Sequence, residues 1–181
     1  MINKIIVAVD QSPLGKPVFD TALSLAKTTG ANLMLLHVMS PKESEYPITP
    51  LNTYYPLVEG IDYEQYHQLF AEYEQRGLKL LQNLTEEATK AEIAAEFTQL
   101  SGNPGRMICE LATNWSADLI VVGSRGLQGL KEMFLGSVSN YVTHHAPCSV
   151  LIFRNSVDQN LEQNLSESDE NSNSQPLATN H

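Results

Sequence analysis

Positive charge is scarce in this sequence. Lysine and arginine together number 11 against 21 aspartates and glutamates, so the formal net charge of the 181-residue chain is −10. Nucleic-acid binding depends on Lys and Arg side chains that neutralise phosphates, and no basic stripe is present, so we expect no nucleic-acid partner. Backbone N–H groups can still bind a nucleotide phosphate, because they need no net positive charge.

Long apolar runs and cysteines are scarce too. No segment approaches the roughly 20 apolar residues of a transmembrane helix, so we expect no membrane partner. The chain starts a strand at once and shows no signal-peptide cleavage pattern. Its two cysteines, Cys109 and Cys148, fit no metal spacing and predict reduced, mostly buried thiols. Together these features favour a cytoplasmic protein.

Several catalytic signatures are missing as well. The sequence has no Gly-Lys-Ser/Thr phosphate loop, no Gly-x-Gly-x-x-Gly, no kinase motif and no Ser-His-Asp arrangement in motif context. No pair of carboxylates is visible that would hold Mg²⁺. We therefore predict no catalytic residue and no metal site built by the protein. His37, inside an apolar run, is expected to be a packed core or crevice-edge histidine rather than a catalyst.

What the sequence does contain is a regular alternation of strand and helix patterns. Four apolar runs and one weakly alternating stretch predict strands, and the amphipathic stretches between them predict helices. This order predicts an α/β fold, a single domain with a five-stranded parallel, doubly wound sheet. The predicted strands are Lys4–Val9, Leu33–Val38, Ala94–Leu100, Leu119–Val122 and Ser149–Phe153; the predicted helices run to about Thr28, over Asp62–Lys90, from Pro104, and from Ser137 to about His145.

Individual residues predict how these helices begin, end and pack. Gly30 is expected to end the first helix, and Asn103 with Pro104 to start the third. Gly77 falls on the apolar stripe of the long second helix, where it would allow close packing. That stripe is predicted to be buried through Tyr66, Leu69, Phe70, Tyr73, Leu80, Leu81 and Leu84, and a further short helix is predicted within residues 127–135.

Two segments depart from the alternation. Residues 39–61 contain four prolines and three tyrosines, which predict a long surface loop. A lid over a ligand and a loose excursion or dimer contact are both open for this loop. After Arg154 the chain turns polar and acidic, which predicts a disordered tail over residues 155–181. The α/β nucleotide-binding domain is therefore assigned to residues 1–154.

One stretch points to a ligand. The predicted strand Leu119–Val122 ends at Gly123, and Gly126 and Gly136-Ser137 follow before a predicted helix. Glycines at the end of a strand let a ligand approach the backbone closely. The first N–H groups of a helix and the positive end of its dipole attract anions. Strand, glycine turn and helix start together predict a phosphate site.

The spacing of this stretch resembles the nucleotide-binding signature of the universal stress protein (UspA) family, in its ATP-binding subgroup. That signature is a glycine, two residues, a glycine, nine residues, a glycine and then Ser or Thr, and Gly123, Gly126, Gly136 and Ser137 meet it. The resemblance implies a Rossmann-like fold of the adenine nucleotide alpha-hydrolase type, with strand order 3-2-1-4-5. It also implies ATP or AMP as ligand, a role in stress-response regulation or signalling, and a homodimer formed through the last strand, Ser149–Phe153.

The same resemblance implies a set of nucleotide contacts. Asp10 is expected near the ribose or base, with capping of a helix as the alternative. Arg125 is expected either to pair with a terminal phosphate or to face solvent, and both are open. Mg²⁺ could arrive with the phosphates. The adenine slot is expected to be lined by Ala8, Val9 and Val38; the phosphates are expected to meet the main chain of Gly123, Gly126, Gly136, Ser137 and Val138 and the hydroxyls of Ser137 and Ser139.

Two other functions stay open at this point. Slow ATP hydrolysis or autophosphorylation would use the same crevice, so whether the protein is an enzyme is undecided. A scaffold that binds partners through the tyrosine-rich loop and the acidic tail, switched by a nucleotide, is the other alternative. The sequence does not distinguish ATP from AMP or from a cyclic adenine nucleotide.

Overall fold

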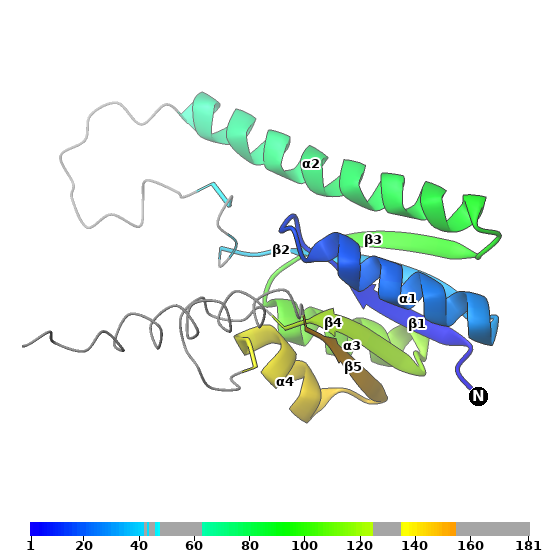
Figure 1. The fold of residues 1–181 in the computed structure, drawn as a ribbon. Coiled ribbons are helices and arrows are strands. Elements are labelled where there is room, and N and C mark those ends of the chain that lie inside the picture. Colours follow the sequence, from blue (N-terminus) through cyan, green and yellow to red (C-terminus); the bar gives the residue numbers. More distant parts are fainter. Residues whose placement is uncertain (42, 44–45, 48–62, 125–134, 155–181) are drawn as a thin grey trace, which may run out of the picture.

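The computed structural model describes residues 1–41, 43, 46–47, 63–124 and 135–154 (Figure 1). The predicted alternation is confirmed. Chain order runs β1 (Lys4–Ala8), α1 (Gly15–Thr29), β2 (Asn32–Met39), α2 (Tyr63–Lys90), β3 (Ala95–Ser101), α3 (Pro104–Trp115), β4 (Leu119–Gly123), α4 (Ser137–His145) and β5 (Ser149–Phe153). The short helix expected within residues 127–135 and the predicted tail lie outside the described residues.

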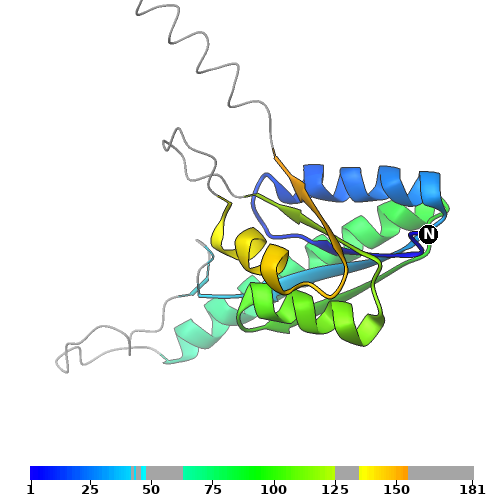
Figure 2. The ribbon, with the colours of Figure 1, turned by 90° about the horizontal axis from the view of Figure 1, so that it is seen from below.

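The five strands form one parallel sheet in the order β3-β2-β1-β4-β5, as the family resemblance implied. Register is continuous across the centre, where Ile6 of β1 pairs with Met34 of β2 on one side and Ile120 of β4 on the other. Helices α1 and α2 cover one face and α3 and α4 the other (Figure 2). Burial on both faces explains why the central strands are continuously apolar.

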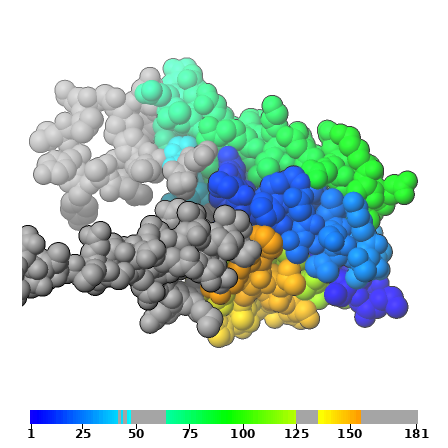
Figure 3. Space-filling view, viewed as in Figure 1, coloured from blue at the N-terminus to red at the C-terminus, as the bar shows by residue number. Residues whose placement is uncertain are grey.

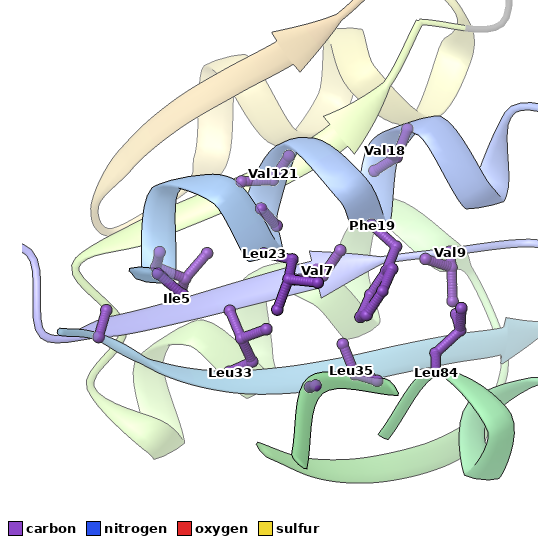
Figure 4. Close-up of a cluster of buried hydrophobic side chains, with 14 of the residues drawn as sticks. Ile5, Val7, Val9, Val18, Phe19, Leu23, Leu33, Leu35, Leu84 and Val121 are labelled. Atoms are coloured by element: carbon purple, nitrogen blue, oxygen red, sulfur yellow. The ribbon is translucent and has the colours of Figure 1, made fainter. Parts of the chain in front are cut away.

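The larger core cluster lies under α1 and α2. Val18, Phe19 and Leu23 of α1 point down onto the strands, while Leu84 reaches the same cluster from α2 (Figure 4). Phe19 is fully buried, and burial of such a side chain contributes about 1.5–3 kcal/mol. On the opposite face, Ile108 of α3 and Val142 of α4 pack on the even-numbered strand residues Ile6, Met34, Leu36 and Val38.

Local signals in the helices are largely confirmed. Gly30 adopts the left-handed conformation that ends α1, with φ of 73°. Asn103 caps α3, accepting a hydrogen bond from Arg106 N at 3.2 Å, and Pro104 is its first residue. On the solvent side, α1 and α2 lie next to each other (Figure 3), and Lys16 Nζ reaches Glu87 Oε1 at 3.0 Å.

Two packing predictions need correction. Leu69 was expected in the buried stripe of α2, but 49% of its surface is exposed. Of the other residues in that stripe, Tyr73, Leu81 and Leu84 are buried as predicted, and the half-buried ones are Tyr66, Phe70 and Leu80. The helix has 28 residues and the strands only five to eight, so at about 1.5 Å per helical residue it outruns the sheet. Cys109 and Cys148 are half-buried rather than mostly buried free thiols. Partial burial raises the pKa of both thiols, which disfavours reactive thiolates.

Candidate functional site

The predicted site lies where the carboxyl ends of β1 and β4 meet. These strands are neighbours, and their last pair joins Ala8 to Val122. After β1 the chain enters α1 on one face of the sheet, whereas after β4 it continues to α4 on the other face (Figure 2). In doubly wound sheets, a crevice for ligands opens at such a switch point. The fold therefore brings Asp10 and Gly123 to the same end of the sheet, where the carboxyl ends of the strands lie.

Asp10 organises the turn that follows β1. Its Oδ1 accepts a hydrogen bond from Ser12 N at 3.0 Å and another from the Ser12 hydroxyl. The Ser12 Oγ in turn accepts from Leu14 N at 3.3 Å. Leu14 is the N-cap of α1, and no side chain caps it. Through the Ser12 hydroxyl, Asp10 therefore also supports the start of α1.

The turn after Asp10 has no room for a side chain at Gly15. A Cβ atom at Gly15 would lie 2.4 Å from the carbonyl oxygen of Asp10, far inside van der Waals contact. The glycine therefore lets the start of α1 fold tightly back onto the end of β1. This close approach fixes the main chain at Asp10 before any ligand binds.

Gln11 is a candidate that sequence reasoning missed. Its Nε2 atom is shielded from solvent and has no hydrogen-bond partner among the described residues. Leaving a buried donor unpaired costs about 1–3 kcal/mol. A ligand that supplies an acceptor, such as a ribose oxygen or a ring nitrogen, would remove that cost. A glutamine directly after Asp10 in the first strand's loop was the only signal available from the sequence.

The three apolar positions predicted for the adenine slot do not share one face of the sheet. Ala8 and Val38 belong to the cluster under α3 and α4. Val9 belongs to the cluster under α1 and α2, and its N–H donates to Leu36 O at 2.9 Å. Ala8 and Val38 can therefore flank one ligand group with their side chains. Val9 packs its side chain into the core of the opposite layer.

The opposite end of the candidate site is the start of α4. Gly136 is the N-cap of α4 with φ of −58° and ψ of 156°, and among the described residues no side-chain hydrogen bond caps the helix. The first helical hydrogen bond runs from Asn140 N to Gly136 O at 2.9 Å. The N–H groups of the first turn are thus unpaired within the helix, and the helix dipole adds partial positive charge there. This arrangement suits a phosphate.

The residues predicted to contact the phosphates differ in solvent exposure and in their hydrogen bonds. Ser137 is exposed, Val138 is half-buried, and the buried Ser139 hydroxyl donates to Gly136 O at 3.0 Å. The Ser139 proton is therefore already engaged in holding the first turn of α4, whereas the Ser137 hydroxyl is more accessible. Gly123 ends β4, where a Cβ atom would lie 3.1 Å from Val18 Cγ2. Arg125 and Gly126 lie outside the described residues.

Two features are absent from residues 1–41, 43, 46–47, 63–124 and 135–154, namely a cluster of metal-ligating side chains and a membrane-spanning helix. Within these ranges, His, Cys, Asp and Glu side chains nowhere gather in groups of three or more suited to a metal ion. None of the helices there has both the length and the apolar character needed to cross a bilayer.

Comparisons with known proteins were made by sequence. A family model described as the universal stress protein family matches residues 1–154. Universal stress protein Sll1388 of Synechocystis sp. is 38% identical over 151 residues, which cover 83% of this chain and 96% of that protein. Universal stress protein YxiE of Bacillus subtilis is 39% identical over 157 residues, covering 85% and 100%.

Comparisons by structure agree on the fold. A universal stress protein family protein of Arabidopsis thaliana, solved with AMP bound, has a TM-score of 0.61 at 24% identity and covers 87% of this chain and 94% of its own. A universal stress protein in complex with cAMP has a TM-score of 0.57 at 23% identity, covering 86% and 98%. One from Archaeoglobus fulgidus in complex with dAMP has a TM-score of 0.55 at 19% identity, covering 84% and 97%. At these identities the likeness shows the fold alone.

Proposed function

The chain belongs to the universal stress protein family, and on that premise we propose that it binds an adenine nucleotide, ATP or AMP, between the ends of β1 and β4. The observation that carries the proposal is the uncapped start of α4, which lies on one side of the switch point and offers unpaired N–H groups to an anion. The complexes of three fold neighbours with AMP, cAMP and dAMP support adenine as the base.

In this proposal the two ends of the nucleotide meet different chemistry. Ala8 and Val38 flank the base, while the Asp10 carboxylate accepts hydrogen bonds from ribose hydroxyls or the base amino group. The Gln11 amide supplies a donor beside it. The phosphates lie against the main chain at the opposite side of the crevice. The residues assigned there are Gly123, Arg125, Gly126, Gly136, Ser137, Val138 and Ser139.

Binding rather than turnover is the proposed activity. In this proposal Mg²⁺ arrives bound to the phosphates of ATP. The described part of the chain has no group of three or more acidic, His or Cys side chains that could hold a metal ion. We propose that nucleotide occupancy regulates a stress response in the cytoplasm, with the protein acting as a homodimer joined through β5. In such a role the ligand changes which surfaces the dimer offers to partners.

Isothermal titration calorimetry with ATP, AMP and GTP tests the proposed site. Wild-type protein is expected to bind the two adenine nucleotides more tightly than GTP. A valine in place of Gly126 puts a branched side chain where the motif requires close backbone approach, so Gly126→Val is expected to weaken ATP binding by at least about tenfold, equal to about 1.4 kcal/mol. The readout is the dissociation constant.

The control for this experiment is the fold of the variant. Circular dichroism and thermal unfolding of Gly126→Val should match wild type, because β4 ends three residues earlier, at Gly123. Equal heats of ATP binding for both proteins would remove the site assignment. A wild-type protein that releases no nucleotide on denaturation and binds none in solution would remove the proposed function itself.

A further inference from the structure

A buried histidine lies beside the proposed nucleotide site without being part of it. His37 is wholly inaccessible to solvent and sits in β2, next to Val38. Helix α2 passes directly over it, because Gly77 has no side chain: a Cβ atom there would lie 2.5 Å from His37 Nδ1. An imidazole enclosed in this way must find hydrogen-bond partners inside the protein.

The partner of Nδ1 fixes one proton on the ring. Gln99 on β3 places its Oε1 3.3 Å from His37 Nδ1. The Gln99 amide is oriented by its Nε2, which donates to Glu74 O at 3.1 Å and to Met39 Sδ at 3.2 Å. Its oxygen can therefore only accept, so Nδ1 of His37 carries a hydrogen.

The partner of Nε2 requires a second proton. Glu43, in the chain that leaves β2, places its carboxylate 3.4 Å from His37 Nε2. The buried Tyr73 hydroxyl of α2 donates to the same carboxylate. An ionised carboxylate only accepts hydrogen bonds. Unless a proton lies between Nε2 and Glu43, a lone pair on nitrogen faces a negative charge in a largely buried place.

The groups around His37 favour its protonated form. Burial by itself lowers the pKa of His37, but the hydrogen bond and charge of Glu43, the contact with Gln99 and the charge of Asp10 outweigh it, so the pKa is raised above its ordinary value. The groups that face the ring are thus Glu43 from the segment after β2, Tyr73 from α2 and Gln99 from β3. Asp10, at the end of β1, acts on the ring through its charge.

We propose that His37 is a positioning residue for the nucleotide: a proton shared between its Nε2 and the Glu43 carboxylate clamps the chain leaving β2 onto α2, and nucleotide affinity falls when that proton is lost. The inference rests on the proposed function. Aromatic contacts extend the clamp, since the Tyr46 ring lies 5.4 Å from Tyr73 and 5.9 Å from Phe70 between centroids. The chain so held directly follows Val38.

The direction of the pH effect follows from the raised pKa. A group whose pKa is higher in the folded state stabilises that state at pH values below its unfolded pKa, about 6.5 for histidine. This stabilisation is lost as the pH rises through the folded-state pKa. The clamp is therefore closed below about pH 6.5 and is released as the pH rises through the folded-state pKa of His37. Loss of the imidazolium also removes a positive charge that supports the Asp10 carboxylate.

Nuclear magnetic resonance of the ligand-free protein tests the clamp directly. The ¹⁵N shifts of the imidazole are expected to report His37 protonated at pH 6, with Nδ1 always bearing hydrogen, and a midpoint above the ordinary histidine value of about 6.5. Glu43→Gln is the informative variant, because its amide can donate to Nε2 without a shared proton. In Glu43→Gln the His37 midpoint should drop, whereas His67→Gln should leave it unchanged.

The consequence for the nucleotide is read by calorimetry with AMP between pH 7 and 9, above the phosphate ionisation at about 6. Wild-type affinity for AMP is expected to fall as the pH rises and His37 loses its proton. The total fall is about tenfold for each pH unit by which AMP binding raises the titration midpoint of His37. Glu43→Gln should show a flat profile. A His37 midpoint at or below the ordinary histidine value of about 6.5 overturns the clamp. A pH-independent wild-type affinity overturns its link to the nucleotide, and absence of AMP binding at every pH would instead refute the proposed function.

Discussion

Gly77 is the residue on which close packing of α2 against the sheet depends. A Cβ atom there would lie 2.5 Å from both Gln99 Oε1 and His37 Nδ1. Displacing either neighbour would cost free energy, because the histidine ring is fully buried and the glutamine is held by two hydrogen bonds. The sequence predicted close packing at this glycine, and the structure confirms it. What the sequence did not indicate was that the glycine lies over a polar cluster.

Replacing Gly77 with alanine should therefore destabilise the protein, although alanine is the better helix former. Contacts as short as 2.5 Å put the overpacking cost at about 2–3 kcal/mol, and the gain in helix propensity is about 1 kcal/mol, so we expect a net loss of about 1–2 kcal/mol. Urea unfolding measures this free energy. The matched control is Asn83→Ala on the exposed side of the same helix, which should change stability by a few tenths of a kcal/mol. Equal stability of Gly77→Ala and wild type would contradict the packing described here.

At the scale of the elements, sequence patterns predicted types and order well and relations between elements less well. Asn103 and Gly30 act locally through their own backbone, so a cap could be identified from the sequence alone. Leu69 could not be placed, because its burial depends on how far the sheet extends beneath α2. Periodicity reports which face of a helix is apolar, and it contains no information about where the opposing surface stops.

The candidate site shows the same division. Glycine spacing identified the end of β4 and the start of α4, since both are features of contiguous sequence. The Glu43–His37–Tyr73–Gln99 cluster, which lies beside that site, brings together residues from β2, α2, β3 and the segment that follows β2. Only the register of β2 with β3 places Gln99 beside His37, and no spacing in the sequence predicted that pair.

The start of α4 offers a test in which stability and binding change in opposite directions. Ser137→Asp puts a carboxylate in the first turn, where the helix dipole stabilises it by about 0.3–1 kcal/mol. The same charge repels a phosphate, so we expect ATP affinity to fall by about tenfold or more. Thermal unfolding and calorimetry read the two effects on one sample.

The matched control for that variant is Asn140→Asp, which adds the same charge on an exposed position of the same helix, beyond its first turn. It should bind ATP within about twofold of wild type, because the dipole effect and close repulsion both fade beyond the first turn. Loss of affinity in both variants alike would indicate a general charge effect and would count against a phosphate site at Ser137.

At the scale of the whole molecule, the two edges of the sheet differ in what they leave uncovered. On β5, Val150 packs against the cluster under α3 and α4, whereas Leu151 and Phe153 pack against the one under α1 and α2. Ile152 is half-buried, yet within the described part of the chain it belongs to neither cluster. An edge strand with an apolar residue of this kind suits pairing with a second copy.

Ile152→Lys should therefore separate the proposed homodimer while leaving the monomer folded, because the substituted side chain gives up little core packing. Light scattering after size-exclusion chromatography is expected to show a dimer for wild type and a monomer of about half that mass for the variant. Phe97→Lys is the control, since Phe97 is the exposed aromatic residue on the opposite edge strand β3, and it should remain a dimer. A dimeric Ile152→Lys together with a monomeric Phe97→Lys would move the proposed interface from β5 to β3.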